Sequence, residues 1–415
     1  MDIEAGVAFA SNPVPSINVE EEWECGFFEG YSTTRFLIIT AVSAISFFGF
    51  FFNLLLLAVF QRSLPSSVYL AALSLLDALI CFTYILLFGV DAGFVYLKNE
   101  FLFNVYHRYI VVVFFLSKVV QFAIPFMLIL ATLERYVWTS AAQTRDFFKP
   151  VFSDAGRCIT TVIIFAISVS LRMPIFFAVE VRQFPQCPDR FRSQSVYPTE
   201  WARSSHPYYV FDFHVIVALQ TVLPFFILLF LNGIIIQRLL IEKKQELPDA
   251  RQNRIRILRA VQMYAAIQPT LYEAAKKVST VNGDYKQVPV MPENYVLLEV
   301  ATELIKESLI TRSCRGKRAQ LRNAIYTMMA IVTSYLVCNG LHLLLTFLER
   351  FKKHLLEDPN DPNLSSTFYI ILSDSVSITY LISSAIRIFI YAKCNPKLRN
   401  DIGKFLRNRK ISLFF

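Results

Sequence analysis

Charged residues are scarce in this chain of 415 residues: they make up 18% of it, against about 25% in an ordinary soluble domain. Glycine is rare as well, with 12 residues, whereas 55% of the chain is hydrophobic and phenylalanine alone occurs 39 times. The apolar residues are gathered in long runs, and residues 36–60 contain no charge at all. About 20 apolar residues are enough to cross a bilayer as a helix. The composition therefore excludes a soluble globular domain and predicts a multi-pass membrane protein.

Short motifs for catalysis and cofactor binding are also missing. The sequence has no glycine-rich phosphate loop, no nucleophile motif and no cluster with metal-ligand spacing, so we expect no enzyme activity, no metal and no cofactor. No internal repeat relates its halves, which weighs against transporters built from inverted repeats. Residues 1–11 are acidic and lack the basic start and apolar middle of a cleavable signal peptide. We expect the first apolar run to direct insertion.

Seven long apolar runs predict seven membrane-spanning helices and an all-α fold. They lie near residues 36–60, 68–90, 105–138, 159–179, 210–237, 323–348 and 367–391. Lysine and arginine favour the cytoplasmic side of a membrane. Residues 1–34 hold seven acids and no base, whereas residues 392–415 hold seven bases and one acid. We therefore expect a protein of the plasma membrane with its N-terminus outside and its C-terminus inside. The net charge of +9 comes from the cytoplasmic segments and is no sign of nucleic-acid binding.

The runs divide the chain into an acidic extracellular tail (residues 1–35), a seven-helix domain (residues 36–392) and a cytoplasmic tail (residues 393–415). Within the domain, residues 238–322 form a cytoplasmic loop too long for a simple connection, and helical extensions of the flanking spans are expected there. In the cytoplasmic tail, four apolar residues share one face of a basic helix: Leu398, Ile402, Phe405 and Leu406. This pattern predicts a short amphipathic eighth helix on the inner leaflet, in contact with membrane lipid.

The third run ends in an acid–arginine–tyrosine triplet, Glu134-Arg135-Tyr136, at its cytoplasmic end. A charged pair at the edge of the hydrocarbon is costly unless the protein uses it. The simpler interpretation is an arginine that only reaches toward water from the end of a span. Landmarks in the other runs argue against that interpretation, and they occur in this order: Asn53, Leu73, Asp77, Pro224, Tyr335, Cys338 and Tyr391.

With these residues the chain resembles a class A (rhodopsin-like) G-protein-coupled receptor, and it is most similar to the neuropeptide-receptor branch expanded in nematodes. The resemblance implies activation by an extracellular peptide and nucleotide exchange on a heterotrimeric G protein. It implies that Glu134 holds Arg135 until the sixth span moves, that Arg135 and Tyr136 serve G-protein coupling, and that Tyr391 swings beneath the bundle. Two other functions stay open: a chemosensory receptor for a small metabolite and, outside this class, a seven-helix transporter.

The seventh run departs from the pattern of the family. Where the family has an Asn and a Pro before its last tyrosine, this chain has Arg387 and Ile388. Arg387 lies at a depth comparable with Asp77 and Asn53, and an unpaired Arg near mid-bilayer costs ~2.5–3.5 kcal/mol on insertion scales. We therefore expect an Asp77–Arg387 ion pair in the place where the family binds a sodium ion. The alternative is that Arg387 extends to water at the inner face.

The sixth run lacks the Trp-x-Pro of the family. Asn339 stands where Trp is usual, Gly340 follows, and Leu341 replaces Pro. Because proline is the commonest cause of a sharp helix bend, we expect a weaker bend here. The resemblance then makes Asn339 part of an internal switch together with Asn53, Asp77 and Arg387.

The extracellular cysteines differ from the family as well. The family joins the third span to the second extracellular loop, but residues 104–110 contain no cysteine. Cys25 and Cys187 are the cysteines expected outside, where the compartment is oxidising, so a Cys25–Cys187 disulfide is predicted. Asn363 begins an Asn-Leu-Ser sequon that is either glycosylated or too close to the membrane for that.

Polar residues near the outer ends of several spans predict the ligand site. Lys118 and Gln121 lie one helical turn apart in an apolar stretch, and His342 and Asp374 lie toward the same side. Such a wide cavity of mixed polarity suits a peptide better than a small amine. Lys118 is expected to meet an acidic or carbonyl group of the ligand; the alternative is an internal partner, Asp374 or Glu180.

Overall fold

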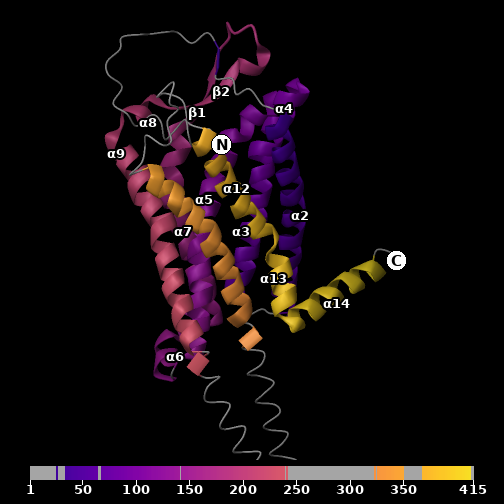
Figure 1. Ribbon diagram of the computed structural model, residues 1–415, viewed down its shortest axis with the longest axis vertical. Helices are drawn as coiled ribbons and strands as arrows, with labels where there is room; N and C mark the ends of the chain where they lie inside the picture. The colour runs from indigo at the N-terminus through magenta and orange to yellow at the C-terminus, as the bar shows by residue number, and fades with distance from the viewer. Residues whose placement is uncertain are drawn as a thin grey trace, which may run out of the picture. The chain divides into compact units, whose positions relative to one another are not determined.

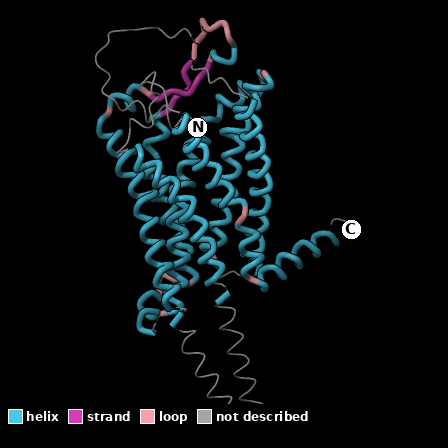
Figure 2. Tube along the Cα trace, in the orientation of Figure 1, coloured by secondary structure: helices cyan, strands magenta, loops and turns pink. Residues whose placement is uncertain are grey.

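The computed structural model describes residues 25–26, 33–63, 67–140, 142–238, 240–241, 322–323, 325–349 and 367–412. These residues are almost entirely helical (Figure 2), and the strands among them form one two-stranded sheet. The middle part of the loop between residues 238 and 322, the sequon at Asn363 and the side chain of Leu406 lie outside the described residues. By contact, the chain divides into two compact units, Met1–Asn232 with Ala324–Phe415, and Gly233–Asn323. Everything that follows about the site concerns the first unit.

Among the described residues, six helices are long and apolar enough to cross a membrane. They are Arg35–Arg62, Val68–Leu97, Glu100–Trp138, Asp154–Ala178, His206–Arg238 and Ile325–Glu349. The bent pair Ile371–Ala385 and Arg387–Cys394 makes a seventh if it is one span. The expectation of an all-α membrane protein is thereby confirmed. A helix suits this environment because it satisfies its own backbone hydrogen bonds, as hydrocarbon requires.

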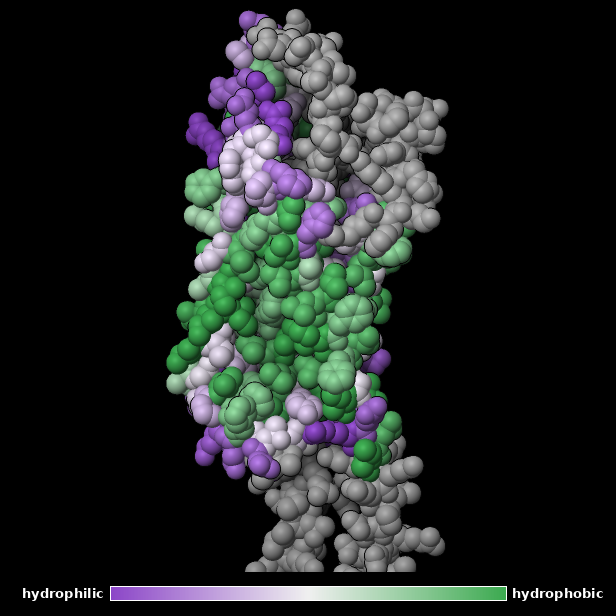
Figure 3. Space-filling view, turned by 90° about the vertical axis from the view of Figure 1, so that its left-hand side faces the viewer, coloured by the Kyte–Doolittle hydropathy of each residue, from purple (hydrophilic) through white to green (hydrophobic). Residues whose placement is uncertain are grey.

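The helices pack side by side along their lengths (Figure 1). α2 (Thr33–Ser63) contacts α3 (Val68–Tyr84) and α12 (Thr367–Ala385), α3 contacts α5 (Glu100–Thr139), and α5 contacts α7 (Asp154–Ala178). Large apolar side chains from several helices meet in a common core: Leu56, Leu73, Ile124, Leu128, Leu228 and Ile331. Outward-facing aromatic residues such as Phe48 and Phe51 stay exposed. One face of the molecule carries an apolar band with hydrophilic residues toward both ends (Figure 3), as a lipid-facing surface requires.

Two of the long helices contain π-helical turns. The first turn, η1 (Ile85–Gly89), joins α3 to α4 (Val90–Leu97) within the second long helix. The others are η3 (Val210–Ile216) and η4 (Ala218–Val222), which follow α9 (His206–Tyr209) in the fifth long helix, His206–Arg238. π turns are rare and often occur at functional sites, and all three border the cavity described below.

A β-hairpin follows α7 at one end of the bundle. β1 (Val179–Gln183) pairs antiparallel with β2 (Gln194–Pro198), with Val181 opposite Val196. Between the strands lies the 3₁₀ turn η2 (Arg190–Arg192), and after them comes α8 (Glu200–Ser204). The sequence did not predict these strands, because five-residue strands in a polar segment leave little periodicity.

Three short helices lie at the other end of the bundle. α6 (Ala142–Phe148) precedes α7, and α13 (Arg387–Cys394) leads into α14 (Pro396–Ser412). α14 buries Leu398 and Ile402, and Phe405 of the same helix packs against the core and under Arg62, whose guanidinium carbon is 5.1 Å from the ring centroid. The apolar face expected from the sequence is therefore the face that contacts the bundle.

Candidate functional site

Two adjoining chambers lie beside the β1–β2 hairpin. The larger, here the outer chamber, has a volume of about 520 Å³ and is bordered by the ends of the hairpin, Val179 and Pro198. The smaller, here the inner chamber, has a volume of about 130 Å³. The two share several lining residues and so form one cavity: Phe114, Lys118, Gln121, Gln220, His342, Leu345 and Ser373.

Three of the four residues predicted to bind a ligand line both chambers: Lys118, Gln121 and His342. The ammonium of Lys118 is 5.2 Å from the centroid of the Phe114 ring, a cation–π distance. The fourth predicted residue, Asp374, lies in α12, but its side chain is outside the described part of the structure.

Hydroxyl and amide groups line part of the inner chamber. The sixth long helix, Ile325–Glu349, supplies Tyr335 and Asn339, and α12 supplies Tyr380. Asn339 donates from Nδ2 to the hydroxyl of Tyr335 at 2.7 Å. The residue at the position of the family's Trp is therefore a lining residue of the cavity, bonded within its own helix.

A buried arginine joins two helices at the wall of the outer chamber. Arg172 of α7 donates from Nη1 to Asp212 Oδ1 at 3.1 Å and from Nη2 to Gln220 Oε1, and its guanidinium carbon is 5.7 Å from the centroid of the Phe122 ring. Positions eight apart in an α-helix differ by about 80° around the axis. The π turns η3 and η4 hold more residues per turn, which brings Asp212 and Gln220 onto one face.

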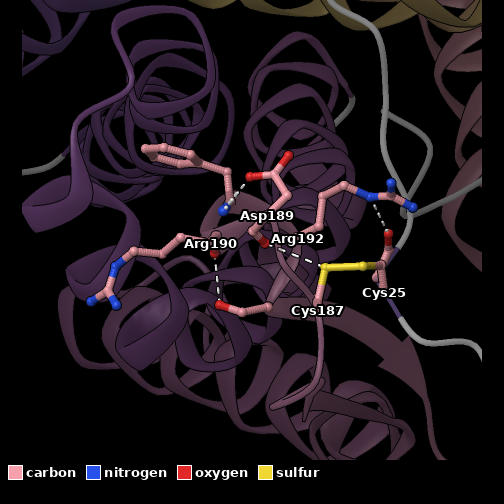
Figure 4. Close-up of a disulfide and its surroundings, with 8 residues drawn as sticks. Cys25, Cys187, Asp189, Arg190 and Arg192 are labelled. Carbon is pink, nitrogen blue, oxygen red and sulfur yellow. Dashed lines mark hydrogen bonds between the residues drawn. A yellow bond between two sulfur atoms is a disulfide. The ribbon is translucent and has the colours of Figure 1, made fainter.

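The predicted disulfide is present between Cys25 and Cys187, with their Cα atoms 4.9 Å apart (Figure 4). The neighbouring Gly26 donates from its amide to the carbonyl of Arg192 at 2.9 Å, and its carbonyl accepts from Arg192 Nε at 3.0 Å. A Cβ on Gly26 would lie 2.8 Å from Ser195 Cβ. Residues 25–26 are thus tied to the hairpin that borders the cavity.

Non-covalent contacts join the hairpin turn to the first residues of α5, where the family has its disulfide. The ring of Phe191 stacks edge-on against Phe103 with centroids 5.6 Å apart, and Lys98 Nζ is 5.0 Å from the Phe191 centroid. Beside them, Arg190 Nε lies 2.9 Å from Glu100 Oε2. An aromatic cluster and an exposed ion pair therefore hold the turn against this helix.

Asp77 and Arg387 form a buried ion pair between α3 and α13. Arg387 donates from Nη1 to Asp77 Oδ2, and Ser384 donates from Oγ to Asp77 Oδ1 at 2.7 Å. The residues Asp77 and Arg387 are 1% and 2% exposed, so the alternative in which Arg387 extends to water does not apply. Asn53 is close by, donating to the carbonyl of Ser384 at 3.1 Å. The structure thus brings together three of the four residues assigned to an internal switch, while Asn339 lies on the cavity.

The expected Glu134–Arg135 pair is not formed. Glu134 Oε1 instead accepts from Arg157 of α7, at 3.0 Å from Nε and 2.8 Å from Nη2. Arg157 also binds the exposed Asp154 at 2.9 Å. The reason is geometric: Glu134 is 5% exposed and faces α7, and successive residues of a helix point in directions about 100° apart.

The other residues assigned to coupling lie at the same end of the bundle. Tyr391 is buried, its ring is 5.2 Å from that of Phe60, and its hydroxyl has no hydrogen-bond partner among the described residues. Arg135 and Tyr136 are half-buried, and Arg135 lies within electrostatic range of the Tyr391 hydroxyl. Arg135 is therefore within electrostatic range of the seventh run, whereas its neighbour Glu134 is paired with α7.

Two residues of this network were missed in the sequence. Neither Arg157, near the start of α7, nor Ser384, near the end of α12, was assigned a role from the sequence. A signal existed for Arg157, since a buried acid such as Glu134 requires a cation. For Ser384 the signal was weaker: it lies three residues, about one helical turn, before Arg387.

The chain matches no protein-family model and no curated protein.

Proposed function

We propose that the protein is a rhodopsin-like G-protein-coupled receptor of the plasma membrane. An extracellular neuropeptide binds in the two-chamber cavity, and the opposite end of the bundle promotes nucleotide exchange on a heterotrimeric G protein. In this proposal α12 and α13 are one span, so that seven spans leave the N-terminus outside and the C-terminus inside. α14 is the eighth helix on the inner leaflet, and no enzyme activity or cofactor is involved.

The observation that supports the proposal most directly is the buried Asp77–Arg387 pair within the same bundle as the cavity. Buried charge inside a membrane bundle is expensive and is found where a protein uses it. Tyr380 lines the inner chamber and lies within electrostatic range of both Asp77 and Arg387, and Tyr391 lies one helical turn beyond Arg387. A contiguous set of polar groups thus leads from the cavity to the end that carries Arg135.

The mixed charge of the outer chamber favours a peptide. A volume of about 520 Å³ falls in the range of ligand pockets, and its lining combines acids and bases, among them Asp212, Glu349, Arg172 and Arg203. The inner chamber alone favours a second candidate, a chemosensory receptor, since its volume of about 130 Å³ accommodates only a small metabolite or one side chain of a larger ligand.

The test begins with a screen of amidated peptides and of small metabolites on cells that express the receptor, with a second-messenger readout. For an active ligand, Arg135→Ala is expected to leave binding within about threefold of wild type while nucleotide exchange on the G protein is lost. The matched control is Arg108→Ala, since Arg108 is exposed on the same helix α5 but near its opposite end. Unchanged exchange in Arg135→Ala would contradict the role given to Arg135, and ligand uptake without exchange would point to the transporter.

A further inference from the structure

The break between α12 and α13 contains no proline. α12 ends at Ala385, Ile386 adopts a turn with φ −81° and ψ −6°, and α13 begins at Arg387. The two helices are bent by 41°. Sharp kinks have identifiable causes, and proline is the usual one. Here the sequence across the break is Ala-Ile-Arg-Ile, so another interaction has to hold the bend.

One carboxylate binds residues on both sides of the break. Asp77 of α3 accepts from Ser384, which precedes Ile386, at 2.7 Å on Oδ1. Its other oxygen, Oδ2, accepts from Arg387, which follows Ile386. Asp77, Ser384 and Arg387 are each at most 2% exposed, so water does not compete for these bonds.

The backbone at the break is also satisfied from a neighbouring helix. Breaking a helix leaves carbonyl groups without their usual amide partners. The carbonyl of Ser384 accepts from Asn53 Nδ2 of α2 at 3.1 Å, and the same amide donates to the carbonyl of Gly49 at 2.9 Å. Asn53 therefore donates the hydrogen bond that the Ser384 carbonyl would otherwise lack because of the bend.

α2 approaches the break so closely that it leaves no room for a side chain. A Cβ on Gly49 would lie 2.9 Å from Ala385 Cβ and 3.0 Å from Cys81 Sγ. The last residue of α12 is thus packed against α2. α13 is held by Arg387 and by the packing of Ile388 and Tyr391 in the core.

We propose that Asp77 is a staple across a proline-free hinge, and that its release from Arg387 sets the angle of α13. Arg387 is the first residue of α13 and Tyr391 lies one turn further on, so a change of this angle moves Tyr391 away from Phe60. The role in activation rests on the proposed function, but the hinge itself does not. Asp77 and Ser384 are positioning residues for Tyr391 in this scheme.

The hinge is tested with nitroxide labels on the full-length protein, at Gln61→Cys in α2 and Lys393→Cys in α13, after Cys158→Ser, Cys314→Ser and Cys394→Ser. Gln61 and Lys393 are both exposed. α13 is about 12 Å long at 1.5 Å per residue, so a change of ~20° in the bend moves its end by ~4 Å. Ser384→Ala and Arg387→Met are expected to shift or broaden the distance distribution by that amount. The matched control is Ser383→Ala, because Ser383 is buried but its hydroxyl contacts Ser334 at 3.3 Å and not Asp77.

A proline provides the rescue. Ile388 occupies the second position of α13, and proline is accepted in the first turn of a helix. It removes only the amide of Ile388, whose acceptor in an unbroken helix would be the carbonyl of Ser384, and that carbonyl accepts from Asn53 instead. Arg387→Met with Ile388→Pro is therefore expected to recover the wild-type distances. The proposal is overturned if Ser384→Ala and Arg387→Met leave the distances unchanged, if Ser383→Ala shifts them equally, or if the proline fails to restore them. These distances need no G protein, so a protein that is not a receptor can still pass the test.

Discussion

Glu134 and Arg157 form the buried ion pair that ties α5 to α7, and both side chains are 7% exposed. Each charge depends on the other, because removing one partner of a buried pair leaves an unpaired charge at a cost of about 3–5 kcal/mol. Because Glu134 binds Arg157, it is not paired with the neighbouring Arg135, and the orientation of Arg135 does not depend on Glu134. The stability of this end of the bundle thus does not depend on a Glu134–Arg135 pair.

Arg157→Gln is expected to lower the melting temperature of the purified protein strongly, because Glu134 stays buried without its cation. Asp154→Asn is the matched control: Asp154 binds the same guanidinium, but its side chain is 91% exposed, and exposed pairs contribute less than about 1 kcal/mol. Thermal unfolding in detergent measures both. Equal losses for the two variants would show that the buried pair has no special weight.

A tethered cation at Asp77 predicts that the protein is insensitive to sodium. Each carboxylate oxygen already accepts a hydrogen bond, from Ser384 or Arg387, and the Arg387 guanidinium neutralises the charge that would attract a diffusible cation. The melting temperature is expected to be the same in sodium chloride and in choline chloride at equal ionic strength. Arg387→Asn leaves the buried carboxylate without a cation, and this variant is expected to gain stability from sodium. A clear sodium effect on the wild-type protein contradicts the prediction.

The charged residues show what the sequence could predict at this scale. Asp77 and Arg387 were paired in advance because each is a lone charge deep in an apolar run at similar depth, and depth can be counted along a helix. Arg157 could not be assigned to Glu134 in the same way, because the depth of a residue does not tell which neighbouring helix its side chain faces. The contacts of Arg172 depend on two π turns, and nothing in the sequence indicates where a helix takes up an extra residue.

At the scale of elements, the start of α7 depends on one close approach. A Cβ on Gly156 would lie 2.2 Å from the carbonyl oxygen of Pro150 and 2.6 Å from that of Val151. These are backbone atoms of the turn between α6 and α7, so they cannot move aside without displacing the turn. Gly156 is the third residue after the N-cap Ser153, and it directly precedes Arg157, which binds Glu134.

Gly156→Ala is expected to destabilise the protein by about 1–3 kcal/mol, the usual cost of overpacking. Gly93→Ala is the matched control, since Gly93 lies within α4 and a Cβ there meets nothing within 4 Å. That change is expected to be neutral or to stabilise by about 0.5–1 kcal/mol, because Ala is the better helix former. Thermal unfolding of the two variants compares them. A Gly93→Ala loss as large as that of Gly156→Ala would contradict the steric explanation.

The hairpin is the element that the sequence did not predict, although its disulfide was predicted. Counting extracellular cysteines is enough to pair Cys25 with Cys187, whereas a two-stranded sheet is stabilised by contacts that lie far apart in the sequence. Here those contacts are the aromatic packing of Phe191 on Phe103 and the hydrogen bonds of Gly26 with Arg192. The covalent link therefore fixes residues 25–26, and the non-covalent contacts fix the hairpin turn.

Cys25→Ser is expected to release residues 25–26 while the hairpin keeps its place on α5. Hydrogen exchange of the Gly26 amide, which donates to the carbonyl of Arg192, should become fast, whereas β1 and β2 should stay protected. Exchange measured by mass spectrometry distinguishes these segments, and non-reducing peptide maps verify the disulfide. Cys158→Ser is the control, because Cys158 is an exposed free cysteine. Loss of protection throughout the hairpin would show that the disulfide, and not the Phe191 cluster, holds it.

At the scale of the whole molecule, the number of spans decides on which sides of the membrane the two ends lie. Six of the helices pass the test of length and apolarity alone, and the seventh does so only if α12 and α13 are counted together. An even number of spans puts both ends on the same side, and an odd number puts them on opposite sides. Whether α12 and α13 form one bent span at Ile386 therefore decides whether the two ends lie on the same side of the membrane or on opposite sides.

An epitope at the N-terminus is expected to be stained on intact cells, and an epitope at the C-terminus only after permeabilisation. The physical reasons are the excess of acids in residues 1–34 and of bases in residues 392–415, together with an internal ion pair that lets α13 keep Arg387 inside the bundle. The control carries both epitopes on a variant in which residues 367–394 are deleted, which leaves six spans and should bring both epitopes to the same side. Staining of both ends on intact full-length cells, or of neither, would mean that α12 and α13 do not cross the membrane as one span, and the seven-span receptor would have to be abandoned.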